Sequence, residues 1–282
     1  MTAAPAVPRR VRPGSARSLL LAVLGEMVWP RGGEVWTASL VRALKVCGVG
    51  EKAARQALAR TAAQGWLVSQ RDGRAVRWRL TPLGIRLMER GLARVESLSV
   101  PQPEWDGRWL VLHVSVPRER AALRNRLTRR LQWAGFGSPA PGVWLSPHVD
   151  RQAEMNELLT SLELGAQAVS FAGPIAQDEL EPAEVVARAW PLHRRLPYYE
   201  ALLERWAGAA DWSDPLAEHL VAVDEWQHLP YVDPQLPREL LPADWPGEAA
   251  TELLASRRTA TADRADAAWQ DLVDSTRPRS RR

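Results

Sequence analysis

Residues 37–80, TASLVRALKVCGVGEKAARQALARTAAQGWLVSQRDGRAVRWRL, decide the fold of the first part of this chain. Two amphipathic helical patterns flank a turn at residues 47–50, and two strand-like segments with an Asp-Gly turn follow them. A helix, a short turn, a second helix and then a β-hairpin is the order of a winged helix–turn–helix. This order predicts a domain that reads DNA with its second helix in the major groove.

Apolar spacing predicts a helix on either side of this motif. Residues 15–27 place Leu19, Leu20, Val23, Leu24 and Met27 on one face, which predicts a first helix packed on the core. Thr37 is the expected N-cap of the helix up to about residue 46. Residues 51–64 form the next helix, ended by Gly65, and Thr81-Pro82 starts a fourth helix that runs to about residue 98.

The helix over residues 51–64 has two unlike faces when its residues are projected at 100° each. Ala54, Leu58 and Thr61 share the side expected to be buried. The opposite side carries Lys52, Gln56, Ala59, Arg60 and Ala63, with Arg55 at the flank. Arginine recognises guanine edges or phosphates and glutamine recognises adenine edges, so this side is expected to face DNA.

The hairpin is expected to contact the DNA backbone. Val76, Trp78 and Leu80 alternate with Arg77 and Arg79 along its second strand. Arg71 and Arg74 flank the Asp-Gly turn at the tip, a position suited to phosphate or minor-groove contact. The complete set of predicted DNA-binding residues is Ser39, Arg42, Lys52, Arg55, Gln56, Arg60, Arg71, Arg74 and Arg77.

Charge is distributed unevenly along the 282 residues. Residues 1–96 hold 17 Lys and Arg against 6 Asp and Glu, a net of +11, whereas residues 97–282 hold 20 against 27, a net of −7. The positive field therefore lies on the segment expected to meet phosphates. A winged helix with a solvated basic surface that binds protein instead of DNA is the alternative interpretation of the same segment.

Several classes of protein are disfavoured. A lone Cys47 excludes a disulfide framework and a multi-cysteine zinc site, and the five histidines have no partner at helical metal-ligand spacing. Nucleophile elbows, phosphate loops and dinucleotide fingerprints do not occur, so we expect a non-enzyme without cofactor or metal. Arg9-Arg10 precedes an apolar run that contains Glu26 and lacks a cleavage site, which disfavours export. Without an apolar segment of about 20 residues, the sequence predicts a soluble, cytoplasmic protein.

A second domain follows the Pro-rich linker at residues 101–104. The pattern predicts strands at 109–116, 134–137, 142–146 and 167–172, with helices at 118–133 and 150–162 between them. This βαββαβ order is the ferredoxin-like topology.

The helix over residues 118–133 carries an outward row of arginines, which are Arg118, Arg120, Arg124, Arg126, Arg129 and Arg130. These side chains can contact flanking DNA or the phosphates of a coenzyme A ligand, and a solvated face is the third interpretation. A nuclease site would need an acidic residue at the end of the first strand. Asp106 precedes that strand and is expected to cap a turn.

The last part of the chain is expected to be helical. Helices are predicted at 182–190, 197–208, 214–228, 246–257 and 260–274, with a non-helical connection that begins at Leu229-Pro230. Aromatic residues at helical spacing can line a ligand pocket, although such residues more often form core. They are Trp190, Tyr198, Tyr199, Trp206 and Trp226.

Several long and unusual stretches occur together in one order: Trp105-Asp106-Gly107-Arg108-Trp109, the segment 135–147 (GFGSPAPGVWLSP) and the segment 233–247 (DPQLPRELLPADWPG). They come after Gly33-Glu34-Val35-Trp36 and Gly65-Trp66-Leu67. In this order the chain resembles the PaaX family of bacterial repressors over nearly its whole length. One departure is Gly50, which stands where a Ser or Thr helix cap is usual.

The resemblance implies a multidomain α+β protein. It implies a winged helix–turn–helix at 17–100, a ferredoxin-like (Cas2-like) dimerisation domain at 105–175 and an all-α domain at 178–275. The basic segments at 1–16 and 276–282, outside these domains, are predicted to be disordered tails. The resemblance implies a homodimer on an inverted repeat in double-stranded DNA. It also implies a small-molecule effector, phenylacetyl-coenzyme A or a related acyl-coenzyme A, that releases DNA and so controls aromatic catabolism genes. The residues expected to contact this effector are Arg124, Trp144, Trp190, Tyr198 and Tyr199.

A function of another class stays open at this point. In that interpretation the chain is a winged-helix interaction protein whose acidic C-terminal domain binds a protein partner. Sequence-specific binding to duplex DNA separates the two functions.

Overall fold

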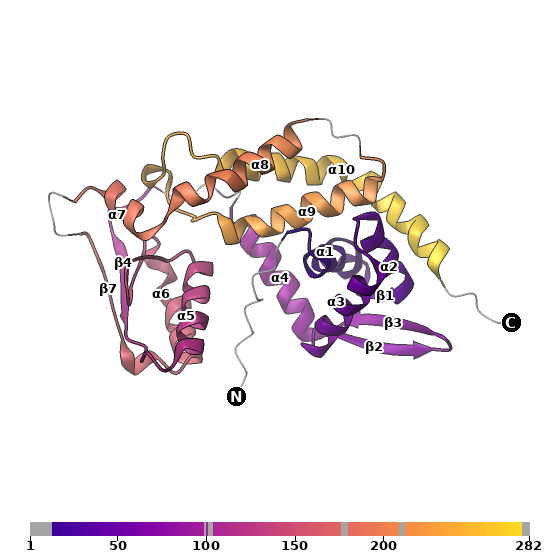
Figure 1. The fold of residues 1–282 in the computed structure, drawn as a ribbon, viewed down its shortest axis with the longest axis horizontal. Coiled ribbons are helices and arrows are strands. Elements are labelled where there is room, and N and C mark those ends of the chain that lie inside the picture. Colours follow the sequence, from indigo (N-terminus) through magenta and orange to yellow (C-terminus); the bar gives the residue numbers. More distant parts are fainter. Residues whose placement is uncertain (1–12, 99, 101–103, 176–179, 209–211, 278–282) are drawn as a thin grey trace. The chain divides into compact units, whose positions relative to one another are not determined.

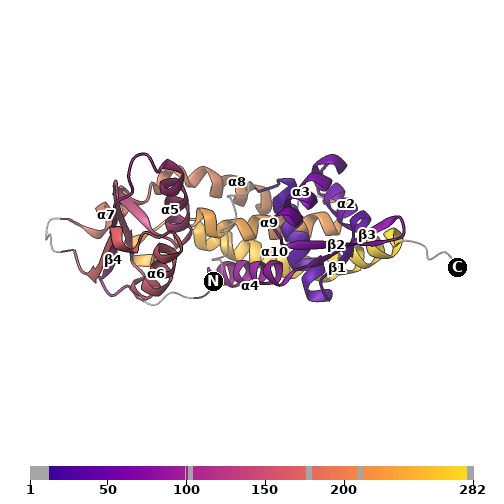
Figure 2. The same ribbon diagram turned by 90° about the horizontal axis from the view of Figure 1, so that it is seen from below.

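The computed structural model describes residues 13–98, 100, 104–175, 180–208 and 212–277. These residues form two compact units, each assembled from segments that are distant in the sequence. The first unit takes residues 100–201 and 230–247, and the second takes residues 8–99, 202–229 and 248–282, apart from the residues outside the described ranges. Figures 1 and 2 label their helices and strands.

The second unit contains the N-terminal elements. They are α1 (Ala16–Val23), which continues as a π-helical turn (Leu24–Val28) and a 3-10 turn (Trp29–Arg31), then β1 (Glu34–Trp36), α2 (Thr37–Val46), α3 (Glu51–Ala63), β2 (Leu67–Asp72), β3 (Ala75–Leu80) and α4 (Pro82–Glu96). The three strands form an antiparallel sheet in the order β1-β3-β2. The predicted order of helices and hairpin is confirmed, and β1 is a strand that the pattern did not reveal.

The predicted faces of the first helix are confirmed. Leu19, Leu20, Val23, Leu24 and Met27 are all buried, in one core with residues of α2 and α3. The fourth helix also begins as expected, because the Thr81 hydroxyl accepts a hydrogen bond from the Gly84 amide at 3.1 Å. Gly84 is required there by a close approach, since a Cβ atom would lie 2.3 Å from the Trp66 carbonyl oxygen.

Two local predictions in this region are wrong. Thr37 is the first helical residue and not the cap of α2, and its hydroxyl donates to the Val76 carbonyl at 3.1 Å and accepts from Trp78 Nε1 at 2.8 Å. It therefore joins α2 to β3. The hairpin turn also lies one residue later than expected, because Asp72 pairs with Ala75 and the loop consists of Gly73, with φ of +61°, and Arg74.

The first unit contains the second sheet. Its elements are β4 (Trp109–Val114), α5 (Ala121–Trp133), β5 (Gly137–Ala140), β6 (Val143–Ser146), a 3-10 turn (Val149–Arg151), α6 (Gln152–Ser161), a 3-10 turn (Gly165–Gln167) and β7 (Ala168–Gly173). The strands pair antiparallel in the order β5-β6-β4-β7. The predicted βαββαβ order is confirmed, and this strand order is the ferredoxin-like one.

The strand expected at 134–137 begins only at Gly137. The preceding residues end α5 instead, because the Gly135 amide bonds the Gln132 carbonyl and the Phe136 amide bonds the Leu131 carbonyl. This pair of bonds around a glycine with φ of +83° is a helix C-terminal motif.

Both faces of this sheet are partly covered. Leu110, Leu112 and Trp144 belong to the core made with α5 and α6, which lie on one side of the sheet in Figure 1. Trp109 and Leu145 belong to a separate core with α7 (Pro182–Ala189) and residues 236–241.

The remaining elements are a 3-10 turn (Leu192–Arg194), α8 (Leu196–Ala207), α9 (Pro215–Val232), a 3-10 turn (Arg238–Leu240) and α10 (Gly247–Thr276). The helix break predicted at Leu229-Pro230 is wrong. Pro230 lies inside α9. Its missing amide removes one hydrogen bond in the last turn, where α9 is about to end.

The two helices predicted at 246–257 and 260–274 are one helix of 30 residues. Thr259 lies at the expected break and Thr261 follows two residues later, and their hydroxyls donate to carbonyls one turn back, of Ala255 at 3.1 Å and Arg257 at 2.8 Å. These side chains are therefore satisfied within the helix.

The predicted disordered tails extend partly beyond the structure. Residues 1–12 and 278–282 lie outside the described residues. At the inner ends of both tails the prediction is wrong, because Ala16 begins α1 and Thr276 ends α10.

Candidate nucleic-acid interface

Helix α3 presents a polar face to solvent. Ala54, Ala57, Leu58 and Thr61 are buried, and the Thr61 hydroxyl donates to the Ala57 carbonyl at 2.8 Å. The exposed residues are Glu51, Lys52, Ala53, Arg55, Gln56, Ala59, Arg60 and Ala63. The predicted division of this helix into a buried and an exposed side is confirmed.

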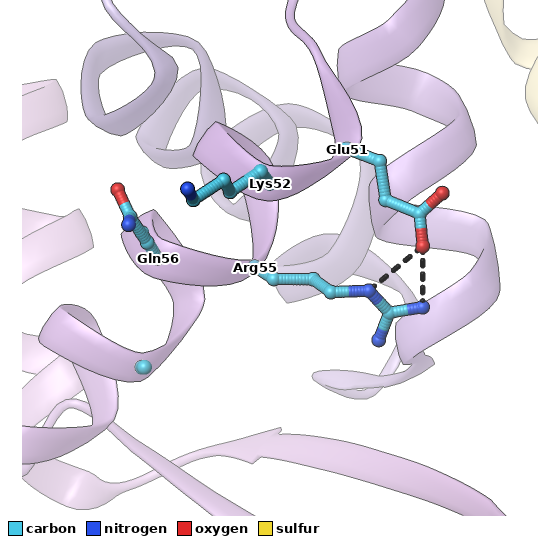
Figure 3. Close-up of a pocket in the computed structure, with 5 residues that line it drawn as sticks. Glu51, Lys52, Arg55 and Gln56 are labelled. Atoms are coloured by element: carbon cyan, nitrogen blue, oxygen red, sulfur yellow. Dashed lines mark hydrogen bonds and ion pairs between the residues drawn. The ribbon is translucent and has the colours of Figure 1, made fainter.

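The exposed side chains of α3 separate into two groups, as Figure 3 shows. Lys52 and Gln56 point to one side, whereas Arg55 turns the other way toward Glu51. Arg55 Nε and one terminal nitrogen lie 2.9 and 2.8 Å from Glu51 Oε1. All four side chains, with Ala59, line an open hollow on the surface of the helix. The positive charge of Arg55 is thus compensated by the carboxylate of Glu51.

The tip of the hairpin exposes Arg71 and Arg74, as the sequence predicts. Arg77 is different, because it lies 3.0 Å from Glu34 and 3.4 Å from Asp72. Its guanidinium also covers the Trp36 ring at 4.7 Å from the ring centre. These contacts join β1 to the hairpin, so Arg77 has a structural role within the sheet.

Two residues of α2 were predicted to contact DNA, and only one of them is exposed. Arg42 is exposed. Ser39 is fully buried, and its hydroxyl is hydrogen-bonded to the Thr276 hydroxyl at 2.7 Å. The expectation that Ser39 is accessible to DNA is therefore wrong.

A second hollow is lined in part by Lys45, a basic residue that the sequence analysis did not predict to contact DNA. It is lined by Ala38, Val41, Arg42, Lys45, Val46, Glu51, Arg55 and Thr276. Lys45 is exposed and lies three residues after Arg42, so the two share a side of α2. The three-residue spacing of Arg42 and Lys45 on one predicted helix could have identified Lys45 from the sequence.

The exposed cations of this region have few acidic neighbours. Among the described residues, no carboxylate lies within 4.0 Å of Arg42, Lys45, Lys52, Arg60, Arg71, Arg74 or Arg79. The acidic residues Glu34, Glu51 and Asp72 are each held by an arginine. We call these seven residues the exposed cations, and their charge is available to an anionic partner.

The five residues predicted to bind an effector do not form one pocket. Trp144 and Trp190 belong to different cores on opposite faces of the sheet. Trp190 covers Gly137, where a Cβ atom would lie 2.4 Å from the indole ring. Tyr199 is fully buried and donates to Asp233 at 2.8 Å, and burial raises the pKa of its hydroxyl.

The other members of that set also make contacts within the first unit. Tyr198 packs edge-on against Tyr199, with ring centres 5.8 Å apart. Arg124 is exposed on α5 and donates to the Pro117 carbonyl at 2.9 Å. Arg126 and Arg129 are exposed nearby on the same helix, whereas Arg130 donates to the Ser161 hydroxyl at 2.6 Å.

Asp106 has the local role expected from the sequence. Its Oδ1 atom accepts a hydrogen bond from the Arg108 amide at 2.9 Å, which makes a turn before β4. Among the described residues, no group of three potential metal ligands occurs. In the same residues, no helix is long and apolar enough to cross a membrane.

A buried charge cluster joins the π-helical turn after α1 to α9 and α10, and sequence reasoning did not find it. Glu26, in the π-helical turn, accepts from Arg258 at 3.0 Å and lies 3.6 Å from His219 Nε2. His219 Nδ1 is hydrogen-bonded to the Thr261 hydroxyl at 2.9 Å. Burial alone would raise the pKa of Glu26, but the hydrogen bonds and charges of His219 and Arg258 together hold it below its usual value.

Two neighbouring acids of α9 are also buried. Asp224 Oδ2 accepts from the Gly14 amide at 2.6 Å, whereas Oδ1 has no hydrogen-bond partner among the residues that the structure describes. Burial raises the pKa of Asp224 to about 6. Glu225 accepts from Arg205 at 2.7 Å and from Trp206 Nε1 at 2.5 Å, and its burial raises its pKa as well.

Comparison with known proteins covers most of the chain. Three family models match in succession: the PaaX-like protein at residues 15–84, the PaaX protein central Cas2-like domain at 102–186 and the PaaX-like protein C-terminal domain at 190–271. The chain is 32% identical over 253 residues to the transcriptional repressor PaaX of Escherichia coli, which spans 86% of this chain and 78% of that protein.

A solved structure is similar over nearly the whole chain. An uncharacterized protein of Mycobacterium tuberculosis has 28% identity, covers 90% of this chain and 99% of its own, and gives a TM-score of 0.60. The multidomain α+β fold, the positively charged N-terminal surface and these similarities define a transcriptional regulator. The chain belongs to the PaaX family of transcriptional repressors.

Proposed function

We propose that this protein is a sequence-specific DNA-binding repressor that acts as a homodimer on an inverted repeat. The observation that carries the proposal is the exposed side of α3, where Lys52, Gln56 and Arg60 stand on a helix whose other side is buried. In a winged helix–turn–helix, this helix enters the major groove.

Each part of the surface then has its own role. Gln56 and Arg60 read base edges, since glutamine pairs with adenine and arginine with guanine. Arg71 and Arg74 at the hairpin tip contact phosphates, which orient the protein but carry no sequence information. Arg42 and Lys45 on α2 are exposed and fit backbone contacts beside the groove.

The homodimer is supported by the sheet of the first unit. Strand β7 is an edge strand, and its six residues carry no charge. Val169 and Phe171 are 66% and 61% exposed on it. Unprotected, apolar edge strands favour pairing with another chain, and a second copy fits the two-fold symmetry of an inverted repeat.

The effector is proposed from family membership. Phenylacetyl-coenzyme A or a related aryl-acyl-coenzyme A would release the protein from DNA and so induce aromatic catabolism genes. The exposed arginines of α5, among them Arg124, offer positive charge for the phosphates of coenzyme A. Such a ligand acts only by preferring one arrangement of the dimer over another.

Fluorescence anisotropy on the DNA upstream of its own gene and on a scrambled duplex tests the proposal. We expect tighter binding to the upstream DNA at every salt concentration, and weaker binding after phenylacetyl-coenzyme A is added. If the protein binds the upstream DNA specifically and the thioester does not change this binding, the proposed effector is wrong and the proposed repressor function stands. Equal, weak binding to both duplexes would contradict the repressor and favour a protein-interaction role.

A further inference from the structure

An acidic residue lies within the exposed side of α3. Glu51 is the first residue of this helix, and it lines one open hollow together with Lys52, Arg55, Gln56 and Ala59. At about 100° per residue these five positions fall within an arc of about 140°, so they form one continuous stripe. DNA phosphates repel a carboxylate, so Glu51 does not fit a stripe that binds only the DNA backbone.

Glu51 holds one edge of the Arg55 guanidinium. Nε and Nη2 of Arg55, which form the side edge of this planar group, lie 2.9 and 2.8 Å from Glu51 Oε1. The third nitrogen, Nη1, points away from the carboxylate in Figure 3. In the part of the chain that the structure describes, Arg55 makes no other hydrogen bond or ion pair. The outer edge of the guanidinium, formed by Nη1 and Nη2, therefore keeps two coplanar N–H donors for a partner.

The charge of the pair favours a base over a phosphate as that partner. Arg55 and Glu51 together are neutral, so their attraction to the DNA backbone is small. The O6 and N7 atoms of guanine are uncharged acceptors that match two parallel N–H donors of an arginine. Because Glu51 already fixes the side edge, the outer edge loses less conformational freedom when it makes these bonds.

We propose that Glu51 is a specificity-determining residue, which positions the Arg55 guanidinium to read a guanine in the major groove. The proposal rests on the proposed DNA-binding function and adds a base contact to it. Glu51 acts through Arg55, because it keeps the guanidinium from turning toward phosphates. The pair therefore strengthens binding to the operator and weakens binding to unrelated DNA.

The test is a salt series of anisotropy titrations with the full-length protein on the upstream and scrambled duplexes. In E51Q a neutral amide of the same size replaces the carboxylate, so Arg55 is free to bind a phosphate. We expect the ratio of upstream to scrambled affinity to fall about 10-fold. The log–log salt slope on the scrambled duplex should become steeper by about 0.9.

A second variant shows whether Glu51 acts through Arg55. R55K keeps the charge but lacks the planar fork, so it should lower the affinity ratio by a similar factor. When E51Q is added to R55K, the ratio should change by less than about twofold, because the two residues act as a unit.

E184Q is the matched control. Glu184 lies in the first turn of α7 and forms an exposed pair with Arg188 at the same spacing, 3.5 Å apart. The control therefore makes the same change in charge and weakens a helix in the same way. It should leave the affinity ratio and the salt slope as in wild type.

Three results would overturn the proposal. The first is an E51Q protein with the wild-type affinity ratio, which includes tighter binding to both duplexes by one factor, as expected from lost repulsion alone. The second is an undiminished effect of E51Q in the R55K background, since Glu51 would then act without Arg55. The third is an equal effect of E184Q.

The two proposals fail in different ways. If wild type prefers the upstream DNA and both E51Q and R55K keep that preference, only guanine reading by the pair is wrong. If wild type binds both duplexes equally, both proposals are overturned. Circular dichroism of each variant checks that the fold is retained, as expected for exposed positions.

Discussion

The charged residues of the second unit occur in two contrasting environments. The exposed cations of α2, α3 and the hairpin lie in solvent without a carboxylate within 4.0 Å among the described residues. The buried charge cluster of Glu26, His219 and Arg258 is enclosed, with side chains 14%, 3% and 33% exposed. Both contain arginine, but only the first leaves its charge available.

The difference separates stability from binding. An exposed ion pair changes the free energy of unfolding by about 0–1 kcal/mol, whereas removal of one partner from a buried pair costs about 3–5 kcal/mol. Substitutions of the exposed cations should therefore change DNA binding and leave the fold intact. Substitutions of the buried charge cluster should change stability first.

The largest effect is expected for Glu26→Ala. It leaves His219 and Arg258 without their shared carboxylate, and because Arg258 is partly exposed we expect a loss near 3 kcal/mol in the free energy of unfolding. Urea unfolding followed by tryptophan fluorescence measures it. Glu51→Ala is the matched control, since it removes an exposed pair with Arg55 and should cost about 0.5 kcal/mol or less. Equal losses would contradict the contrast between the two environments.

Asp224 should make stability depend on pH. Its pKa is raised to about 6 from a usual 3.8, so the folded state holds the proton more tightly than the unfolded state. The contribution of Asp224 to the free energy of unfolding is then greatest below about pH 4, and it falls by about 3 kcal/mol at most as the pH rises through 6. Asp224→Asn removes this titration.

The measurement is the difference in unfolding free energy between Asp224→Asn and wild type, taken at intervals from pH 4 to pH 7. We expect the variant to gain relative to wild type as the pH rises. A difference that stays constant over this interval would mean that Asp224 titrates alike in both states.

Next in size are the effects on DNA binding. Gln56→Ala and Arg60→Ala should each cost about 1–3 kcal/mol at the operator if each reads a base, and nearly nothing on scrambled DNA. Arg74→Ala should weaken binding to every duplex and reduce the salt slope by about 0.9. Anisotropy on both duplexes measures these losses. A loss from Gln56→Ala that is equal on the two duplexes would refute base reading.

The exposed cations of α3 were predictable from the sequence, whereas the buried charge cluster was not. Helical projection placed Lys52, Gln56 and Arg60 on the exposed side of α3, because one amphipathic helix contains the whole signal. The buried charge cluster joins Glu26 to residues about 190 and 230 positions later, a pairing that local periodicity does not encode.

The errors in the predicted fold also arise from contacts between residues that are distant in the sequence. The antiparallel sheets, the βαββαβ order and most helices followed from local patterns. The prediction that Ser39 contacts DNA was wrong because Ser39 is hydrogen-bonded to Thr276, 237 residues away. The prediction that Thr37 caps α2 was wrong because β3 supplies the hydrogen-bond partners of its hydroxyl. The effector residues did not converge, because the alternation of side chains places Trp144 on the sheet face away from Trp190.

Arg77→Ala is expected to give the smallest effect and tests the boundary between the two environments. Arg77 was predicted to bind DNA, yet its charge is compensated by Glu34 and Asp72 and its guanidinium covers Trp36. The residue is half-exposed, so we expect a loss of about 1 kcal/mol or less in stability. Its salt slope for DNA should stay close to that of wild type. If Arg77→Ala flattened the slope as much as Arg74→Ala, Arg77 would have to leave its carboxylates to contact a phosphate, and it would join the exposed cations.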